Sequence, residues 1–293
     1  MPCAIHFDSR RDYQSTDGHL NSDECNARGL GEVFVVGVCL LTLVRVPTVM
    51  SAPSTRYVHS HKGGHKAPED SPSYMYPCGK SHEEEMKYSS TSRESDSEIL
   101  KHIIISTKSA LSYAESFRDR YVESTFHLSF DQHHAQWVNQ KYDWLPNEGN
   151  GIPKRLGKGV DPIHLESKTF DEFLVNIYEH LQKFAVGLEQ VVWDQKKTNG
   201  KFQENFRMAE VHLRNVLCEI RMAMIERNVT PRDHVPRSIM KDDFRHLESA
   251  SYRNLRDWFI FRDLMNSLEY VIQVFTFIEE NLPSSAGATS SSS

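Results

Sequence analysis

Residues 169–197 read TFDEFLVNIYEHLQKFAVGLEQVVWDQKK, and this stretch decides the fold class. Its first residues, Thr169 and Glu172, form a capping box, whose side chains accept hydrogen bonds from unpaired amides at a helix start. Apolar residues then follow at alternating spacings of three and four: Phe170, Phe173, Ile177, Leu181, Phe184, Leu188 and Val191. Such a pattern forms one apolar stripe along an α-helix. We therefore predict a helix over 169–197, ended by Asn199-Gly200.

Three more segments carry the same periodicity, over residues 95–122, 201–227 and 247–281. The first opens on a second capping box, Ser95 with Glu98. The last has a stripe wide enough for a helix that is buried between two neighbours. A short separate turn over 242–246 leaves its N-terminal boundary open.

The connections between the four segments predict their order in space. About four residues join the second and third helices, which fits an antiparallel hairpin. About 45 residues separate the first two helices, and about 15–18 separate the last two, far more than short bundle loops need. Long, short, long is typical of an up-up-down-down bundle with two crossover loops. We expect an all-α, long-chain four-helix bundle over 95–282, with the tryptophan- and proline-containing first crossover packed along it.

The N-terminal region looks like a leader. The apolar run 33–44 is too short to span a bilayer but matches a signal-peptide h-region, and Ser51-Ala52 would suit cleavage. We predict a leader over 1–52, a flexible polar segment over 53–94 and a tail over 283–293. A buried core segment or a signal anchor are the alternatives for 33–44.

Cysteine positions agree with secretion. Cleavage near Ala52 would leave only Cys78 and Cys218, which could form one disulfide in an oxidising compartment. Two buried free thiols are the alternative. Asn228-Val229-Thr230 is a glycosylation sequon between the last two helices. The dibasic pair Lys154-Arg155 leaves open whether the first crossover is processed.

No pattern in the chain indicates catalysis. The formal net charge of −6 gives no reason to expect nucleic-acid binding. Glu-x-x-His pairs, nucleophile motifs and phosphate-binding loops are missing from the sequence, and His133-His134 reads as an exposed loop. We expect a protein that is not an enzyme, with no cofactor and no metal.

A secreted chain of four long helices with two crossovers resembles the long-chain helical cytokines. The segment 256–264, RDWFIFRDL, looks like the start of the last helix in interleukin-six-type ligands, where a Phe-x-x-Lys pair contacts a shared receptor; here Phe259 and Arg262 have that spacing. The chain is also similar in character to the insect Unpaired ligands of the JAK/STAT pathway. The resemblance implies a secreted, extracellular ligand that joins cell-surface cytokine receptor chains, without stable membrane insertion after cleavage.

The resemblance also implies where receptors would bind. One receptor would contact the outer faces of the first and third helices, where Glu210, Arg214 and Arg221 point away from the stripe. Another would contact the start of the last helix, with Trp258, Phe259 and Arg262. Trp258 and Phe259 lie about 100° apart on a helix, so one of them should be exposed, unless the helix starts earlier and both are buried against the first crossover.

Two other classes of protein remain. In an intracellular helical adaptor, 33–44 would be a core segment and Asn228 would stay unmodified. A helical lipid carrier would need an unfilled cavity, which the large stripe residues argue against.

Overall fold

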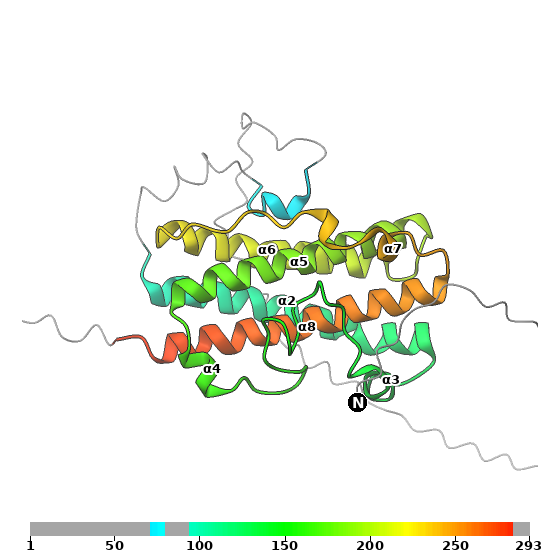
Figure 1. Cartoon of the computed structure of the whole chain (residues 1–293), viewed down its shortest axis with the longest axis horizontal. Coiled ribbons are helices and arrows are strands. Elements are labelled where there is room, and N and C mark those ends of the chain that lie inside the picture. Colours follow the sequence, from blue (N-terminus) through cyan, green and yellow to red (C-terminus); the bar gives the residue numbers. More distant parts are fainter. Residues whose placement is uncertain (1–70, 80–93, 284–293) are drawn as a thin grey trace, which may run out of the picture. The chain divides into compact units, whose positions relative to one another are not determined.

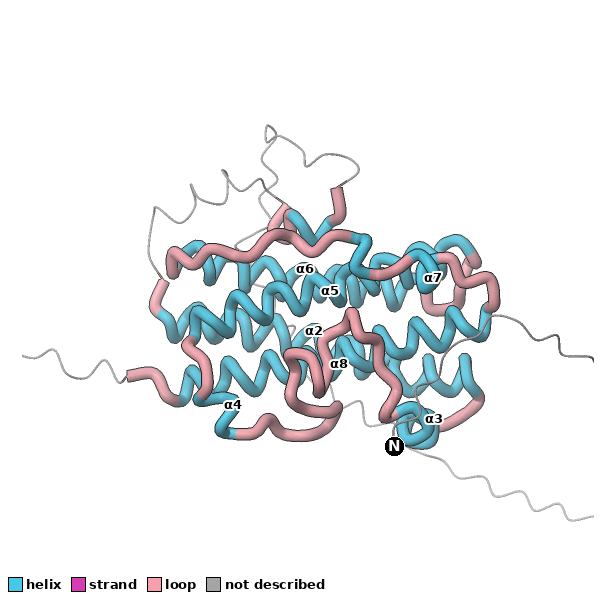
Figure 2. Tube along the Cα trace, viewed as in Figure 1, coloured by secondary structure: helices cyan, strands magenta, loops and turns pink. Residues whose placement is uncertain are grey.

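The computed structural model describes residues 71–79 and 94–283, which are helical and contain no strand. Four long helices dominate: α2 (Asp96–Phe126), α5 (Phe170–Lys197), α6 (Gln203–Glu226) and α8 (Ala250–Glu280). Shorter helices occur in the connections: α3 (Phe130–Trp137), α4 (Pro162–Glu166), α7 (Asp242–Arg245), and the 3-10 turns η2 (Ser73–Met75) and η3 (Arg237–Ile239). The all-α prediction is confirmed (Figures 1 and 2).

Each long helix packs against two others. α2 lies against α6 and α8, and α5 also lies against α6 and α8. The apolar stripes face inward, as predicted: the stripe positions of α2 and α6 are all buried. Rings from three helices meet at the centre, where Phe261 of α8 stacks on Phe117 of α2 at 4.9 Å and meets Phe206 of α6 at 5.5 Å between ring centroids.

The helix ends are fixed by their caps and by ion pairs. Both predicted capping boxes are present, at Ser95 and at Thr169. Arg227, just after α6, bonds to Asp96 and Asp171 in the first turns of α2 and α5. At the opposite ends, the Tyr121 hydroxyl of α2 donates to the Asn254 carbonyl of α8 at 3.4 Å. The starts of α2 and α5 therefore meet the end of α6, and the end of α2 meets the start of α8.

Two expectations for the connections are corrected. His133-His134 does not lie in an exposed loop but in α3, and His133 is only 3% exposed. Residues 71–79, predicted to be flexible, form η2 and pack on α6, with Tyr74 buried. The leader 1–52 with its apolar run 33–44, the rest of 53–94 apart from 71–79 and 94, and the tail from 284 onward lie outside the described residues.

Candidate functional site

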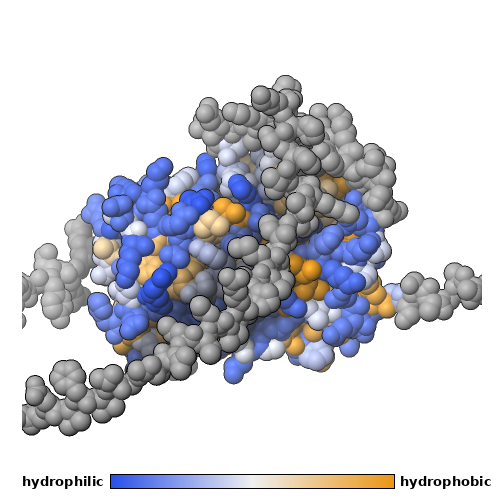
Figure 3. All heavy atoms as spheres, turned by 180° about the vertical axis from the view of Figure 1, so that it is seen from behind, coloured by the Kyte–Doolittle hydropathy of each residue, from blue (hydrophilic) through white to orange (hydrophobic). Residues whose placement is uncertain are grey.

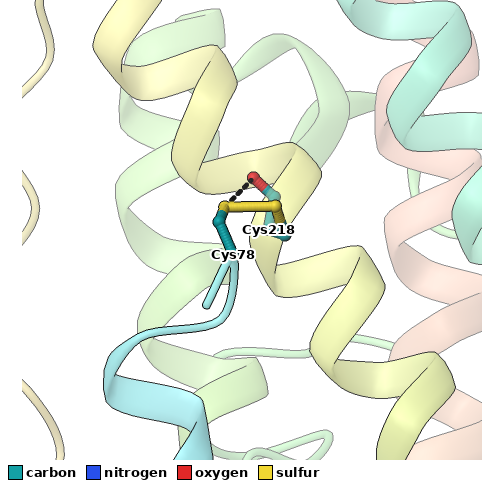
Figure 4. The surroundings of a disulfide bond; sticks show 2 residues. All are labelled: Cys78 and Cys218. Atoms are coloured by element: carbon teal, nitrogen blue, oxygen red, sulfur yellow. Dashed lines mark hydrogen bonds between the residues drawn. A yellow bond between two sulfur atoms is a disulfide. The ribbon is translucent and has the colours of Figure 1, made fainter. Parts of the chain in front are cut away.

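A disulfide joins Cys78 to Cys218 of α6, with the two Cα atoms 4.9 Å apart (Figure 4). It attaches the segment 71–79 to the middle of α6, across a sequence separation of 140. Tyr74 anchors the same segment, because its hydroxyl donates to the Val235 carbonyl at 3.0 Å. Burial raises the pKa of Tyr74 to about 12. The predicted pairing of the two cysteines is confirmed.

This segment covers the side of α6 on which the sequence places a receptor contact. The Glu210 carboxylate is half-buried and accepts a hydrogen bond from the Ser73 side chain, and burial raises its pKa. Arg214 is half-buried and Arg221 is buried, at 7% exposed. The expectation that all three lie on an open helix face is wrong, because residues 71–79 pack there.

The start of α8 is also covered. Trp258, Phe259 and Arg262 are 0%, 6% and 4% exposed, so the expectation of an exposed aromatic beside an arginine is wrong. Phe259 packs on Trp137 and Tyr142 of the first crossover, at 5.7 and 5.5 Å between ring centroids. The alternative, burial of both aromatics against that crossover, is confirmed.

Arg262 begins a row of polar side chains that holds the first crossover on α8. Its guanidinium donates to the carbonyls of Trp137 at 2.8 Å and Gln140 at 2.6 Å. The same group donates to the Asp263 carboxylate at 2.8 Å. Since buried carbonyls need a donor, Arg262 satisfies backbone groups at the end of α3.

The row continues at Asn266 and Glu269. The Lys154 ammonium, whose side chain is fully buried, donates to Asn266 at 2.8 Å and Glu269 at 2.5 Å. Glu269 also accepts from the Gly157 amide at 2.8 Å. One turn later, Gln273 accepts from the Val160 amide at 2.8 Å. The helical spacing of the polar residues 262, 266, 269 and 273 is a sequence signal for this face that the sequence analysis did not use.

These contacts bear on the dibasic pair. Lys154 is buried in its ion pair while Arg155 is exposed and pairs with Glu148 at 2.8 Å. A protease that needs both basic side chains in its subsites would have to pull Lys154 out of the fold. The folded crossover therefore protects the peptide bond after Lys154-Arg155 from cleavage.

Among the described residues, one face between α2 and α6 is at least partly exposed. Tyr113 of α2 stacks on His212 of α6, with ring centroids 4.8 Å apart. Ile105, one of the exposed large apolar residues, is 66% exposed. Helical spacing places further, at least partly exposed residues of this α2–α6 face beside these three: the uncharged Ser109, Ser116, Met208, Asn215 and Met222, and the charged Lys101, Lys108 and Glu219. Apolar patches among hydrophilic side chains are visible on the surface in Figure 3.

The sequon residue Asn228 follows α6 directly. It is exposed and has a left-handed backbone conformation, with φ of 56°. Asparagine tolerates this conformation better than most residues. The side chain is accessible for attachment of a glycan.

Hollows in the described part of the chain are polar. One of about 590 Å³ lies where α2 meets α3, and one of about 170 Å³ lies between the crossover and α8, lined in part by His134, Lys141 and Asp263. Within residues 71–79 and 94–283, no three His, Cys, Asp or Glu side chains come together as metal ligands would. Nor does this part contain a helix with the length and apolar composition needed to cross a bilayer.

Comparison of the chain with protein-family models, with curated proteins and with solved structures finds no match.

Proposed function

We propose that this protein is a secreted, cytokine-like ligand that acts by bringing cell-surface receptor chains together, without catalysis. The observation that carries the proposal is the Cys78–Cys218 disulfide, which ties the N-terminal segment to α6. Structural disulfides persist in oxidising compartments and are rare in the cytosol. In this proposal 1–52 is a cleaved leader, and Asn228 carries a glycan.

We further propose the up-up-down-down topology of a long-chain four-helix bundle. Two observations support it. The connection 198–202 is short, while 127–169 and 227–249 are long. The bonds of Arg227 bring the starts of α2 and α5 to the end of α6. In Figure 1 the colours run in one direction along α2 and α5 and in the other along α6 and α8.

The receptor surface in this proposal is the α2–α6 face and not the start of α8. Tyr113, His212 and Ile105 give it the mixed aromatic and apolar character of protein interfaces. The residues first expected to bind receptor are buried or covered, so their side chains are not available to a partner. As the resemblance implies, the partner is a receptor of the interleukin-six-receptor type that signals through JAK kinases and STAT proteins.

The test is binding of purified secreted protein to cells of the source organism, with STAT phosphorylation as the second measurement. Ile105→Glu would place a charge on this face, and we expect at least a tenfold loss of both signals, since hot-spot residues contribute about 2 kcal/mol or more. Ile163→Glu is the matched control, because Ile163 on α4 is 76% exposed and lies away from this face.

Equal activity of the two variants would remove the α2–α6 face from the proposal. Failure of the unmodified protein to bind any cell surface, together with its retention inside expressing cells, would contradict the ligand function and favour the adaptor.

A further inference from the structure

Helix α3 is held on α8 by rings more than by hydrogen bonds. His133 lies between Phe126, at 3.9 Å, and Trp258, at 5.1 Å between ring centroids. It is 3% exposed, and neither of its ring nitrogens has a hydrogen-bond partner among the described residues. Burying a neutral imidazole without hydrogen bonds costs some free energy. Burying a charged imidazole without a counterion costs far more.

The two ends of α3 are held in different ways. It follows α2 after a short turn in which His127 adopts a left-handed conformation with φ of 57°. At its other end, the hydrogen bonds to α8 that the described residues show come from Arg262, to Trp137 and Gln140. These bonds fix the C-terminal end of α3, whereas its first turns depend on ring packing.

The positive charges around α3 disfavour protonation of its histidines. His134 stacks on Phe130 of its own helix, at 5.5 Å. It faces Arg118 from α2, Arg262 from α8 and Asp131 from its own helix. Lys141 lines the hollow beside it.

The other nearby carboxylate, Asp263, is engaged through one of its two oxygens. That oxygen accepts from Arg262, while the second oxygen is buried without a partner. His133 faces Arg262 and His134. Protonation of either histidine would therefore add a positive charge to a site that already contains several cationic side chains.

We propose that α3 is an acid-sensitive flap, which leaves α8 when His133 takes up a proton and thereby uncovers Trp258. The inference goes beyond the proposed receptor function and does not depend on it, because it rests on the packing of α3 alone.

The direction in which pH changes the docking of α3 follows from the shifted pKa of His133. Burial, and then the positive charge of Arg262 and the neighbouring His134, lowers the pKa of His133 from 6.5 to about 4. The docked state therefore binds the proton less well than the released state. Docking is complete above pH 6.5 and is weakened as the pH falls from there towards 4. From these values, release should increase roughly eightfold between pH 7 and 5.5 and roughly sixtyfold by pH 4.5.

The test is amide hydrogen exchange of the full secreted protein between pH 7 and 4.5, corrected for the intrinsic effect of pH on exchange. We expect residues 130–137 to lose protection in acid while residues 103–121 of α2 keep theirs. His133→Phe keeps a ring of similar shape that cannot be protonated, so the acid response of α3 should be largely lost. His246→Phe, at an exposed histidine, is the matched control and should behave as the unmodified protein.

NMR titration of the histidine rings of the unmodified protein gives a second reading, which does not need the variant to fold. A His133 ring that titrates below about 5 supports the proposal. A ring that titrates near 6.5, or an acid response of α3 that His133→Phe leaves unchanged, would overturn it.

Discussion

Gly187 lies in the interior of α5, where glycine is less favourable than alanine by about 1 kcal/mol. Its role is to let side chains approach the helix backbone. A Cβ atom at this position would lie 3.0 Å from both Ile260 of α8 and Trp144 of the first crossover. The missing side chain therefore lets two layers of the core meet at α5.

The first prediction follows from this contact. Gly187→Ala should lower the free energy of unfolding by about 1–2 kcal/mol, because overpacking outweighs the gain in helix propensity. Urea denaturation measures the change. Gly159→Ala is the matched control, since a Cβ there meets no atom within 4 Å. An equal or higher stability of Gly187→Ala would show that Ile260 and Trp144 adjust without cost.

Single residues also show where the sequence did not predict which side chains are buried. The period of the stripe correctly places Trp258 in the core, but period alone does not say what covers the opposite side of the helix. Phe259 and Arg262 looked exposed because a four-helix bundle offers no partner for that side. The partner is the first crossover, whose path has no sequence period. By contrast, counting cysteines after the expected leader predicted the Cys78–Cys218 pair, although it left two free thiols as the alternative.

At the scale of elements, α8 differs from α2 and α6 because its buried surface extends around most of its circumference, as it also does in the middle of α5. α2 and α6 have an outer side, while α8 has the crossover packed there through Arg262, Asn266 and Glu269. Helix positions were predictable to within a few residues, since caps and stripes are local signals. α3 also has such a signal, the capping box of Ser129 and Gln132, which our sequence analysis did not use.

The second prediction concerns the ion pair that attaches the first crossover to α8. Lys154→Met keeps the length of the side chain but leaves Glu269, whose side chain is 18% exposed, without its cation. We expect a loss of about 2–4 kcal/mol of stability, because breaking a largely buried ion pair leaves an uncompensated charge. Chemical denaturation measures the loss, and hydrogen exchange should show faster opening of residues 152–160.

Lys158→Met is the control, because Lys158 is exposed and contributes its backbone carbonyl to Gln273. If both variants were equally stable, Lys154 would have no part in holding the crossover. Cleavage after Arg155 should also be faster in Lys154→Met than in the unmodified protein, because the crossover opens more often.

At the scale of the whole molecule, the disulfide closes a long loop that contains α2, the first crossover, α5 and the larger part of α6. A crosslink of this kind stabilises chiefly by restricting the unfolded chain. It also keeps residues 71–79 over Glu210, on a side of α6 where Tyr74 provides the apolar contact. The disulfide agrees with the proposed oxidising compartment.

The third prediction tests that dependence. Replacing both cysteines, Cys78→Ser with Cys218→Ser, should lower the free energy of unfolding by about 2–4 kcal/mol. Thermal and urea denaturation measure it under non-reducing conditions. Reduction of the unmodified protein should give the same loss. A variant as stable as the oxidised protein would mean that the bond adds nothing to the fold.

The most direct test of an extracellular ligand is the intact mass of the protein in the medium of expressing cells, with and without reduction and deglycosylation. We predict a chain that starts near Pro53, carries a glycan at Asn228 and gains two hydrogen atoms on reduction, as one disulfide requires. Protein found only inside the cells, starting at Met1 with reduced cysteines and an unmodified Asn228, would contradict the account.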